Sequence, residues 1–169
     1  LWKWTDNGDG TTTRVSITNT TAAQAAENPK VDSSGRYVSF SSLLDFSGGT
    51  ATGRKFFIVD TQTNVIRNLT STGVGNTGLD VPDTEISPDG NWVYFESNRD
   101  LVTGSNVDGN RELFAYNVQS QTLSQLTATT GGVSISGFSD DATRRYVEIA
   151  GSNGNIVYRS DRLLDPTVV

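Results

Sequence analysis

The chain has 169 residues and a formal net charge of −6, and it contains no cysteine, histidine or methionine. These absences exclude a Ser-His-Asp triad, a thiol nucleophile, a disulfide framework and the common ligand sets of structural zinc. The acidic pI near 4.5, without any basic cluster, argues against nucleic acid as a partner. No apolar run in the sequence has the length needed to span a bilayer.

The composition favours many short strands joined by turns. Glycine reaches 17 residues, and threonine, serine and asparagine fill the intervals between runs of valine, isoleucine, phenylalanine, tyrosine and tryptophan. In chain order, we expect a strand at 1–5, a turn at 6–10 and a strand at 11–17. The first full cycle then follows, with strands at 29–32, 36–42, 55–59 and 65–69, and the second cycle has strands at 84–87, 91–97, 112–118 and 122–126.

The two cycles are copies of one repeat. The run Val31 to Phe40 aligns without gaps on Ile86 to Phe95 at a spacing of 55 residues, and a looser third copy lies between Phe138 and Ile149. Phe57 and Phe114 are 57 residues apart, so the two extra residues fall in the loop between the second and third strands. Loops accept such insertions at little cost.

Each repeat is expected to form a sheet that is buried on both faces. Its strands read as continuous apolar runs, such as Trp92 to Phe95 and Phe56 to Val59, rather than as strict alternation. An antiparallel four-stranded sheet with two buried faces needs a neighbour on each side, as a blade of a β-propeller has. The predicted fold is therefore all-β, with about three propeller blades, and a β-sandwich is the alternative.

The repeat also resembles a known family. The run from Ser87 to Ser97, the loop and strand from Leu101 to Tyr116, and Gln125 to Thr127 are similar to the WD40-like repeat of TolB-type β-propellers. The first copy matches through 33–40, 57–60 and 68–70, whereas the third has Ala142 in place of the turn glycine. The resemblance implies a secreted or periplasmic propeller that acts as a protein-interaction scaffold or as the gate domain of a serine peptidase.

The blade boundaries predict a partial propeller over residues 1–169. We expect a half blade at 1–18, whole blades at 28–70 and 83–127, and a half blade at 133–160, with 155–160 starting a third strand. Trp2 aligns with Phe57, and Val15 aligns with Leu69 if the first turn has one extra residue. Since the chain begins at Leu1, it fits a processed or trimmed product.

Two half blades leave strand edges and apolar side chains that invite pairing with another chain. We expect the C-terminal half blade of one copy to complete the N-terminal half blade of the next, in a closed ring of two copies or in a filament. The alternative is that the chain is part of a longer propeller. The expected interface residues are Leu1, Trp2, Trp4, Val15, Ile17, Tyr146, Val147 and Ile149.

Two loop motifs suggest ligands or modifications. Oxygen-bearing side chains stand at alternate positions in Asn106, Asp108, Asn110 and Glu112, as in a calcium loop, although a plain turn before a strand explains the pattern as well. Asn19 and Asn68 fit the acceptor pattern for N-glycosylation. No other cofactor is expected.

The sequence thus predicts a non-enzymatic, extracellular or periplasmic module with no catalytic residues and no membrane span. The leading hypothesis is a self-assembling structural subunit whose partners are copies of itself. One alternative is a scaffold whose long polar loops, at 18–28, 43–54, 70–82, 98–111 and 128–132, bind another protein or a glycan on one face. A second alternative is an enzyme, as a glycosidase with a carboxylate pair or as the propeller domain of a serine peptidase.

Overall fold

A computed structural model describes residues 1–18, 26–46, 53–71, 84–129, 147–149 and 156–158. This part of the chain is all-β, with strands and turns and no helix. No helix capable of crossing a membrane is therefore present among these residues.

The strands form two four-stranded sheets and two two-stranded sheets. The first pair is β1 (Trp2–Asp6) and β2 (Thr12–Ser16). The first four-stranded sheet contains β3 (Glu27–Val31), β4 (Tyr37–Ser42), β5 (Lys55–Asp60) and β6 (Val65–Asn68). The second contains β7 (Thr84–Ile86), β8 (Trp92–Ser97), β9 (Glu112–Asn117) and β10 (Thr122–Gln125). The last pair is β11 (Val147–Ile149) and β12 (Ile156–Tyr158).

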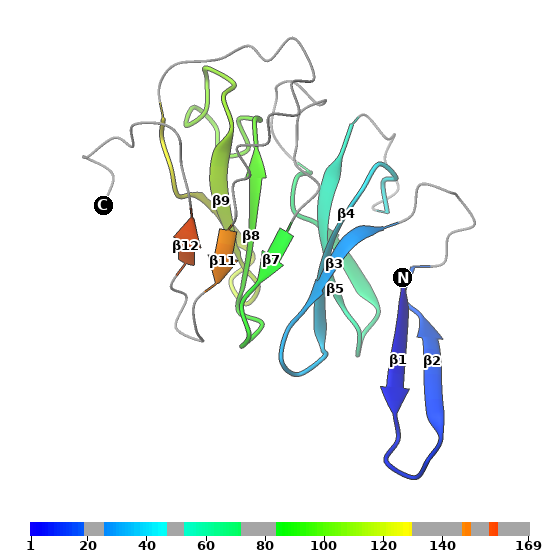
Figure 1. Ribbon diagram of the computed structural model, residues 1–169. Helices are drawn as coiled ribbons and strands as arrows, with labels where there is room; N and C mark the ends of the chain where they lie inside the picture. The colour runs from blue at the N-terminus through cyan, green and yellow to red at the C-terminus, as the bar shows by residue number, and fades with distance from the viewer. Residues whose placement is uncertain (19–25, 47–52, 72–83, 130–146, 150–155, 159–169) are drawn as a thin grey trace, which may run out of the picture.

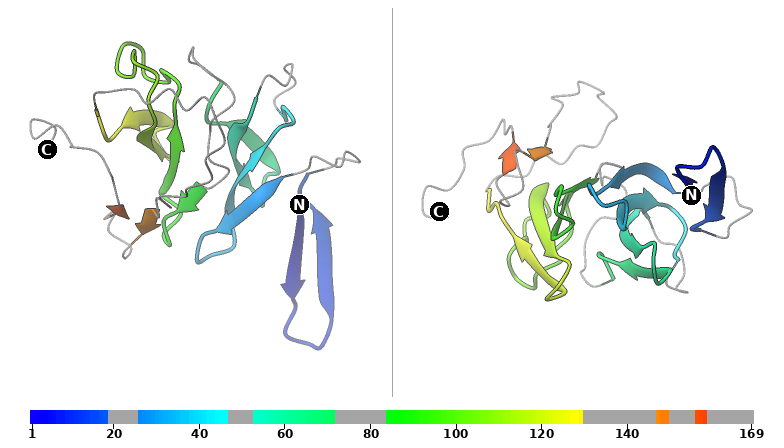
Figure 2. Two further views of the ribbon diagram at one scale, coloured as in Figure 1. Left: turned by 45° about the horizontal axis from the view of Figure 1, so that its top comes forward. Right: turned by 90° about the horizontal axis from the view of Figure 1, so that it is seen from below.

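Both four-stranded sheets are antiparallel meanders, in which each strand pairs with the next one along the chain. They stand side by side, with β7 lying against β3 and β4 (Figures 1 and 2). The closest approach between the sheets is thus at their first strands, as in neighbouring propeller blades. The all-β fold with four-stranded blades is confirmed, and the splayed arrangement does not fit the sandwich alternative.

The turns between the first and second strands follow the expected local chemistry. Gly35 and Gly90 adopt φ values of 71° and 72°, where a side chain would be strained. Before each glycine a side-chain oxygen accepts a hydrogen bond from the start of the next strand. Asp32 Oδ1 lies 2.9 Å from Tyr37 N, and Ser87 Oγ lies 2.9 Å from Trp92 N. The two turns are therefore built alike although their sequences differ.

β3 differs from the prediction at its start. It begins at Glu27, two residues before the expected Pro29, and its pairing with β4 shifts register between Glu27 and Lys30. Asn28 has a φ of 48°, which asparagine tolerates better than most residues. The strand is predicted to start at Pro29, and a bulge at Asn28 and Pro29 lets it start earlier, at Glu27.

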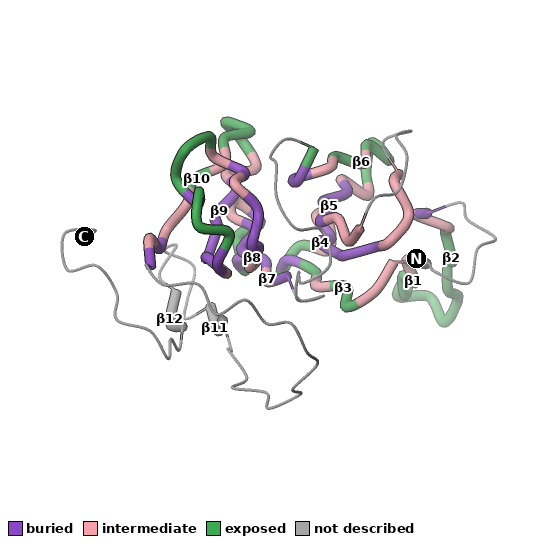
Figure 3. Tube along the Cα trace, turned by 90° about the horizontal axis from the view of Figure 1, so that it is seen from above, coloured by how far each residue is buried: buried purple, intermediate pink, exposed green. Residues whose placement is uncertain are grey.

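Each face of the first blade packs against a different neighbour. Phe57 and Val59, both fully buried, join Val38 and Phe40 in a cluster against which Leu1 and Ile17 also pack. The opposite face of the first blade packs against the second blade. Phe56 and Ile58 alternate with Phe57 and Val59 along β5 and point the other way. They belong to a cluster shared with residues of the second blade, which include Val93, Phe95, Phe114 and Tyr116. The buried residues follow β4, β5, β8 and β9 (Figure 3). Burial on both faces explains the unbroken apolar runs.

Polar contacts also join the two blades. Ser39 and Thr84 share a buried hydrogen bond of 2.9 Å, and Lys30 Nζ lies 2.6 Å from Glu85 Oε1. The backbone N–H of Ser33 donates to the carbonyl of Pro88 at 2.9 Å, so the two first turns are linked directly. These contacts fix the position of one blade on the next.

We predict that Gly90→Ala destabilises the protein more than Gly35→Ala. Both glycines have positive φ, so each substitution costs about 1–2 kcal/mol of backbone strain. A Cβ at Gly90 would also lie 2.9 Å from Asp32 Oδ2 and from the Tyr37 ring, whereas nothing lies within 4 Å of a Cβ at Gly35. The extra clash should add about 1–3 kcal/mol. Urea unfolding measures the difference, and equal losses of stability would contradict it.

Candidate functional site

The hairpin formed by β1 and β2 is the main candidate site. It projects from the first blade with its turn pointing away from the rest of the molecule (Figure 1). The ladder pairs Trp2 with Ser16, Trp4 with Arg14 and Asp6 with Thr12. The carboxylates of Asp6 and Asp9 accept hydrogen bonds from the backbone of Gly8 and Thr11, which closes the turn. The turn is thus the plain Asx-type hairpin that the sequence indicates.

One face of the hairpin is attached to the first blade. Leu1 and Ile17 pack against its apolar cluster, and Lys3 Nζ donates to the Gly35 carbonyl and to Thr61 Oγ1, each at 3.1 Å. The N-terminal ammonium donates to Thr18 Oγ1, and Thr18 is buried. This face already has a partner within the chain.

The other face is apolar and open to solvent. Trp2 and Trp4 are each 63% exposed, and the guanidinium of Arg14 lies 4.8 Å from the centre of the Trp2 ring. Successive side chains of a strand point to opposite faces, so the two tryptophans share the face away from Leu1 and Lys3. We call Trp2, Trp4 and Arg14 the outward face of the hairpin.

The backbone ladder gives the correspondence between the hairpin and the outer strands of the blades. Ile17 N donates to the Leu1 carbonyl at 2.8 Å, as Leu69 N donates to that of Phe56. Trp2 and Trp4 therefore occupy the positions of Phe57 and Val59, as the alignment of Trp2 predicts. The alignment of Val15 with Leu69 is wrong, because the hairpin turn has three extra residues rather than one. Ile17 corresponds to Leu69, and Val15, which is 47% exposed, corresponds to Arg67.

The expected C-terminal half of the interface is only partly described. Tyr146 lies outside the described residues, while Val147 and Ile149 belong to β11, which pairs with β12 and lies against β7. The structure does not bring the expected N-terminal and C-terminal residues together within one molecule, because the two pairs stand on opposite sides of the blades (Figure 2).

Two residues of the hairpin were missed by the sequence argument. Arg14 and Lys3 both border the expected apolar residues, Arg14 over Trp2 and Lys3 on the Gly35 carbonyl. Alternation of side chains along 1–5 and 12–16 assigns Arg14 to the face of Trp2 and Trp4, and Lys3 to the opposite face. This alternation was not applied to the hairpin, because the strands elsewhere in the chain are continuous apolar runs.

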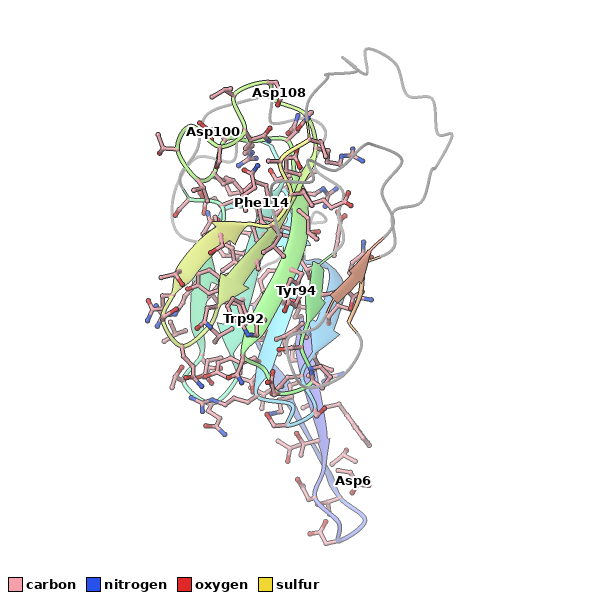
Figure 4. All side chains as sticks on the ribbon, turned by 90° about the vertical axis from the view of Figure 1, so that its left-hand side faces the viewer. Asp6, Trp92, Tyr94, Asp100, Asp108 and Phe114 are labelled. Carbon is pink, nitrogen blue, oxygen red and sulfur yellow. The ribbon has the colours of Figure 1, made fainter. Side chains whose placement is uncertain are left out.

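The loop at 98–111 stands at the opposite end of the molecule from the hairpin turn, as the labels of Asp100, Asp108 and Asp6 show (Figure 4). Asp100 closes this loop by accepting backbone hydrogen bonds from Gly104, Ser105 and Asn106 at 2.8–3.1 Å. These hydrogen bonds lower the pKa of the Asp100 carboxyl from its ordinary value, and the bond from Gly104 has the largest effect. The Asp100 carboxylate thus holds the backbone of this loop in place.

Of the four residues in the calcium-like pattern, Glu112 is fully engaged in the fold. Both carboxylate oxygens of buried Glu112 accept hydrogen bonds, from Thr127 Oγ1 and from the backbone and hydroxyl of Thr129. Asp108 is exposed and accepts from Asn110. Asn106 and Asn110 are buried, with an Oδ1 atom that has no donor, but these are neutral oxygens. Among the described residues no three carboxylate, histidine or cysteine side chains gather at one point.

The two glycosylation motifs differ in their setting. Asn19 lies outside the described residues. Asn68 ends β6, and its Oδ1 atom accepts hydrogen bonds from the backbone N–H and the hydroxyl of Thr70 at 2.9 Å and 3.1 Å. The Thr70 hydroxyl also receives the N–H of Phe56, so this motif is part of the blade framework.

We predict that the Asp100 carboxylate titrates below its ordinary range and that Asp100→Asn loosens the loop. Because the folded-state pKa is lowered, the bonds to Gly104 and Ser105 persist above the unfolded pKa of about 3.9 and are lost as pH falls through the folded value. Amide NMR shifts of these residues should titrate below pH 3.8 in the wild type and not in Asp100→Asn. Asp108→Asn is the control, and a titration that persists in Asp100→Asn would contradict this assignment.

We also predict that calcium does not change the thermal stability of the protein. The carboxylate oxygens of Glu112 are engaged by Thr127 and Thr129, so a bound ion would have to displace those donors. The thermal midpoint should be the same in excess chelator and in millimolar calcium. A rise in the midpoint with calcium that is lost in Asp108→Asn would restore the calcium hypothesis.

Comparisons with known proteins bear on the fold. No family model matches the chain, and no curated protein matches it. A solved structure described as oligogalacturonate lyase in complex with manganese matches 98% of this chain and 42% of its own, with 18% identity and a TM-score of 0.52.

TolB from Acinetobacter baumannii matches 68% of this chain and 24% of its own, with 17% identity and a TM-score of 0.44. An oligogalacturonate lyase from Vibrio parahaemolyticus matches 76% and 30%, with 14% identity and a TM-score of 0.43. The chain thus spans less than half the length of each of these structures. Together with the two antiparallel meanders, the match to the first lyase establishes the fold that the repeat predicts, which is that of TolB-like β-propeller blades.

Proposed function

We propose that this chain is a self-associating structural β-propeller module and that a second copy covers the outward face of its hairpin. One observation carries the proposal. Trp2 and Trp4 are each 63% exposed, although Phe57 and Val59, at the same positions of the first blade, are fully buried. In the second blade, Phe114 and Tyr116 hold these positions and are also buried. The outward face is therefore a blade surface without its neighbour.

Burial of this face would stabilise an assembly substantially. Each tryptophan that becomes covered could contribute roughly 2 kcal/mol. Arg14 adds a cation stacked on Trp2, which a neighbouring aromatic or carboxylate could also contact. A patch of this kind on a soluble protein marks an interaction surface.

Strand number supports blade completion as the mode of association. The sheet of β1 and β2 has two described strands, the sheet of β11 and β12 has two, and each whole blade has four. Pairing β1 of one copy with the C-terminal strands of another would restore a four-stranded sheet. Two copies related by a closing rotation would form a ring of six blades, and a rotation that does not close would form a filament.

The proposed module is non-enzymatic and works outside the cytoplasm. The chain contains no histidine or cysteine for nucleophilic catalysis, and the extracellular or periplasmic location follows from the TolB-type resemblance. The lyase match supports no activity here, because 18% identity over part of that protein speaks only to fold. The alternative of a scaffold that binds a protein or glycan would use the loop end, where Asp100 and Asp108 lie (Figure 4).

We predict that substituting Trp2 and Trp4 together by serine dissolves the assembly. Both side chains are exposed in the single chain, so the double variant should change its unfolding free energy by less than about 0.5 kcal/mol. Light scattering should show a particle of several 18.2 kDa chains for the wild type and of one chain for the variant.

Val107→Ser is the matched control, since Val107 is 83% exposed in the loop at the other end. Mass spectrometry of the denatured chain completes the test. A wild-type particle of one chain, or a double variant with unchanged particle mass, would overturn the proposal. A partner bound at the loop end and unaffected by the double variant would favour the scaffold instead.

A further inference from the structure

The two copies of the repeat share their strand order and antiparallel pairing, so a difference in exposure at equivalent positions indicates a missing neighbour. Val31 and Ile86 hold the same place, each pairing across its sheet with a valine, Val38 or Val93. Ile86 is 7% exposed because it packs in the cluster between the blades, whereas Val31 is 61% exposed. The first strand of the first blade therefore has an uncovered apolar side chain on the face toward the hairpin.

The neighbouring turn shows the same difference. The space beside Gly90 is filled by Asp32 and Tyr37 of the preceding blade, at 2.9 Å from a built Cβ, and the space beside Gly35 is empty to 4 Å. The carbonyl of Pro88 receives the N–H of Ser33 from the preceding blade. Ser33 holds the position of Pro88 in its own blade, so its carbonyl stands where the next such bond would form. The first turn at 32–35 thus has Lys3 on its Gly35 carbonyl, but among the described residues no blade packs beside Gly35 as the first blade packs beside Gly90.

On this face of the first blade, the residues of β4 and β5 are buried and Val31 of β3 remains exposed. Leu1 and Ile17 pack against the cluster that these β4 and β5 residues form, and Lys3 Nζ donates to the Gly35 carbonyl. β3 lies between β7 and the hairpin (Figure 3), with its face toward β7 occupied through the ion pair of Lys30 and Glu85. Val31 and the turn at 32–35 therefore form an uncovered patch at the first strand of this blade.

We propose that this patch, which we call the inner seat, consists of Val31, the Ser33 carbonyl and Gly35 and binds the first two strands and the first turn of a blade from a second copy. The inference rests on the proposed self-association and names where the incoming strands dock. The interface between the two blades shows which kind of partner fits this position, since Ser33 N there donates to the Pro88 carbonyl and Asp32 and Tyr37 lie beside Gly90. By the same geometry, the incoming blade needs a turn that donates one N–H to the Ser33 carbonyl. It also needs a carboxylate or aromatic side chain beside Gly35.

The chain lacks cysteine, so single engineered thiols report this seat directly. Val31→Cys and the control Val107→Cys are both exposed in the single chain and should react with a maleimide at similar rates at high dilution. At concentrations where light scattering shows several chains per particle, the thiol at position 31 should react roughly ninefold more slowly. That factor is the ratio between the exposures of Val31 and Ile86, at 61% and 7%. The thiol at position 107 should keep its rate.

The outcomes separate this inference from the proposed function. If the particle contains several chains and the thiol at position 31 still reacts at full speed, self-association stands and the inner seat is wrong. If that thiol is protected in a particle of one chain, the occupant is the same chain and the second copy is excluded. If the thiol is free and the particle is single, both proposals fail.

A charge at the seat gives a second test that does not depend on labelling. Val31→Arg should shift the particle toward single chains, because the arginine would have to be buried in the position that Ile86 holds. Val65→Arg and Val107→Arg, at valines that are 45% and 83% exposed, should leave the particle mass unchanged. Equal behaviour of all three variants would overturn the inner seat.

Discussion

Blade-on-blade stacking is the interaction on which the rest of this structure depends. The rings of Phe56 and Phe95 stack at 4.7 Å between the two sheets, and Phe95 stacks in turn on Phe114 at 5.8 Å. A sheet that is apolar on both faces cannot be stable alone, so each blade takes much of its stability from its neighbours. The order of the sheets, the form of the first turns and the exposed hairpin face all follow from this requirement.

Much of the fold could be predicted from the sequence, because its signals are local. The spacing of 55 residues between Gly35 and Gly90, with apolar runs on both sides, indicates four-stranded repeats before any coordinate is known. Turn residues act within a few positions of themselves, and the structure has turns at 33–35 and 88–90, between the expected strands. The match at Trp2 is also correct, since nothing between Leu1 and Asp6 interrupts the register.

The rest depends on contacts between distant residues. The sequence alignment matches Val15 to Leu69, two positions too early. Val15 and Ile17 are both hydrophobic and suit that position equally, and the length of the preceding turn cannot be read from the sequence. Only the hydrogen bond from Ile17 N to the Leu1 carbonyl fixes the register. The loop motif of Glu112 resembled a metal site because its spacing is visible, whereas its donor Thr129, 17 residues away, is not. The exposure of a side chain is harder still to predict from sequence. Val31 and Ile86 hold the same position of the repeat, and they differ in exposure because they have different neighbours.

The contact between the blades differs in side-chain size from one pair of strands to another. Small side chains meet where Ser39 of β4 contacts Thr84 of β7, and large ones meet where Phe56 of β5 stacks on Phe95 of β8. Two sheets separated by a thin layer at one side and a thick layer at the other form a wedge. The volumes of these side chains therefore set the angle by which each blade rotates from the last, and that angle determines how many blades complete one full turn.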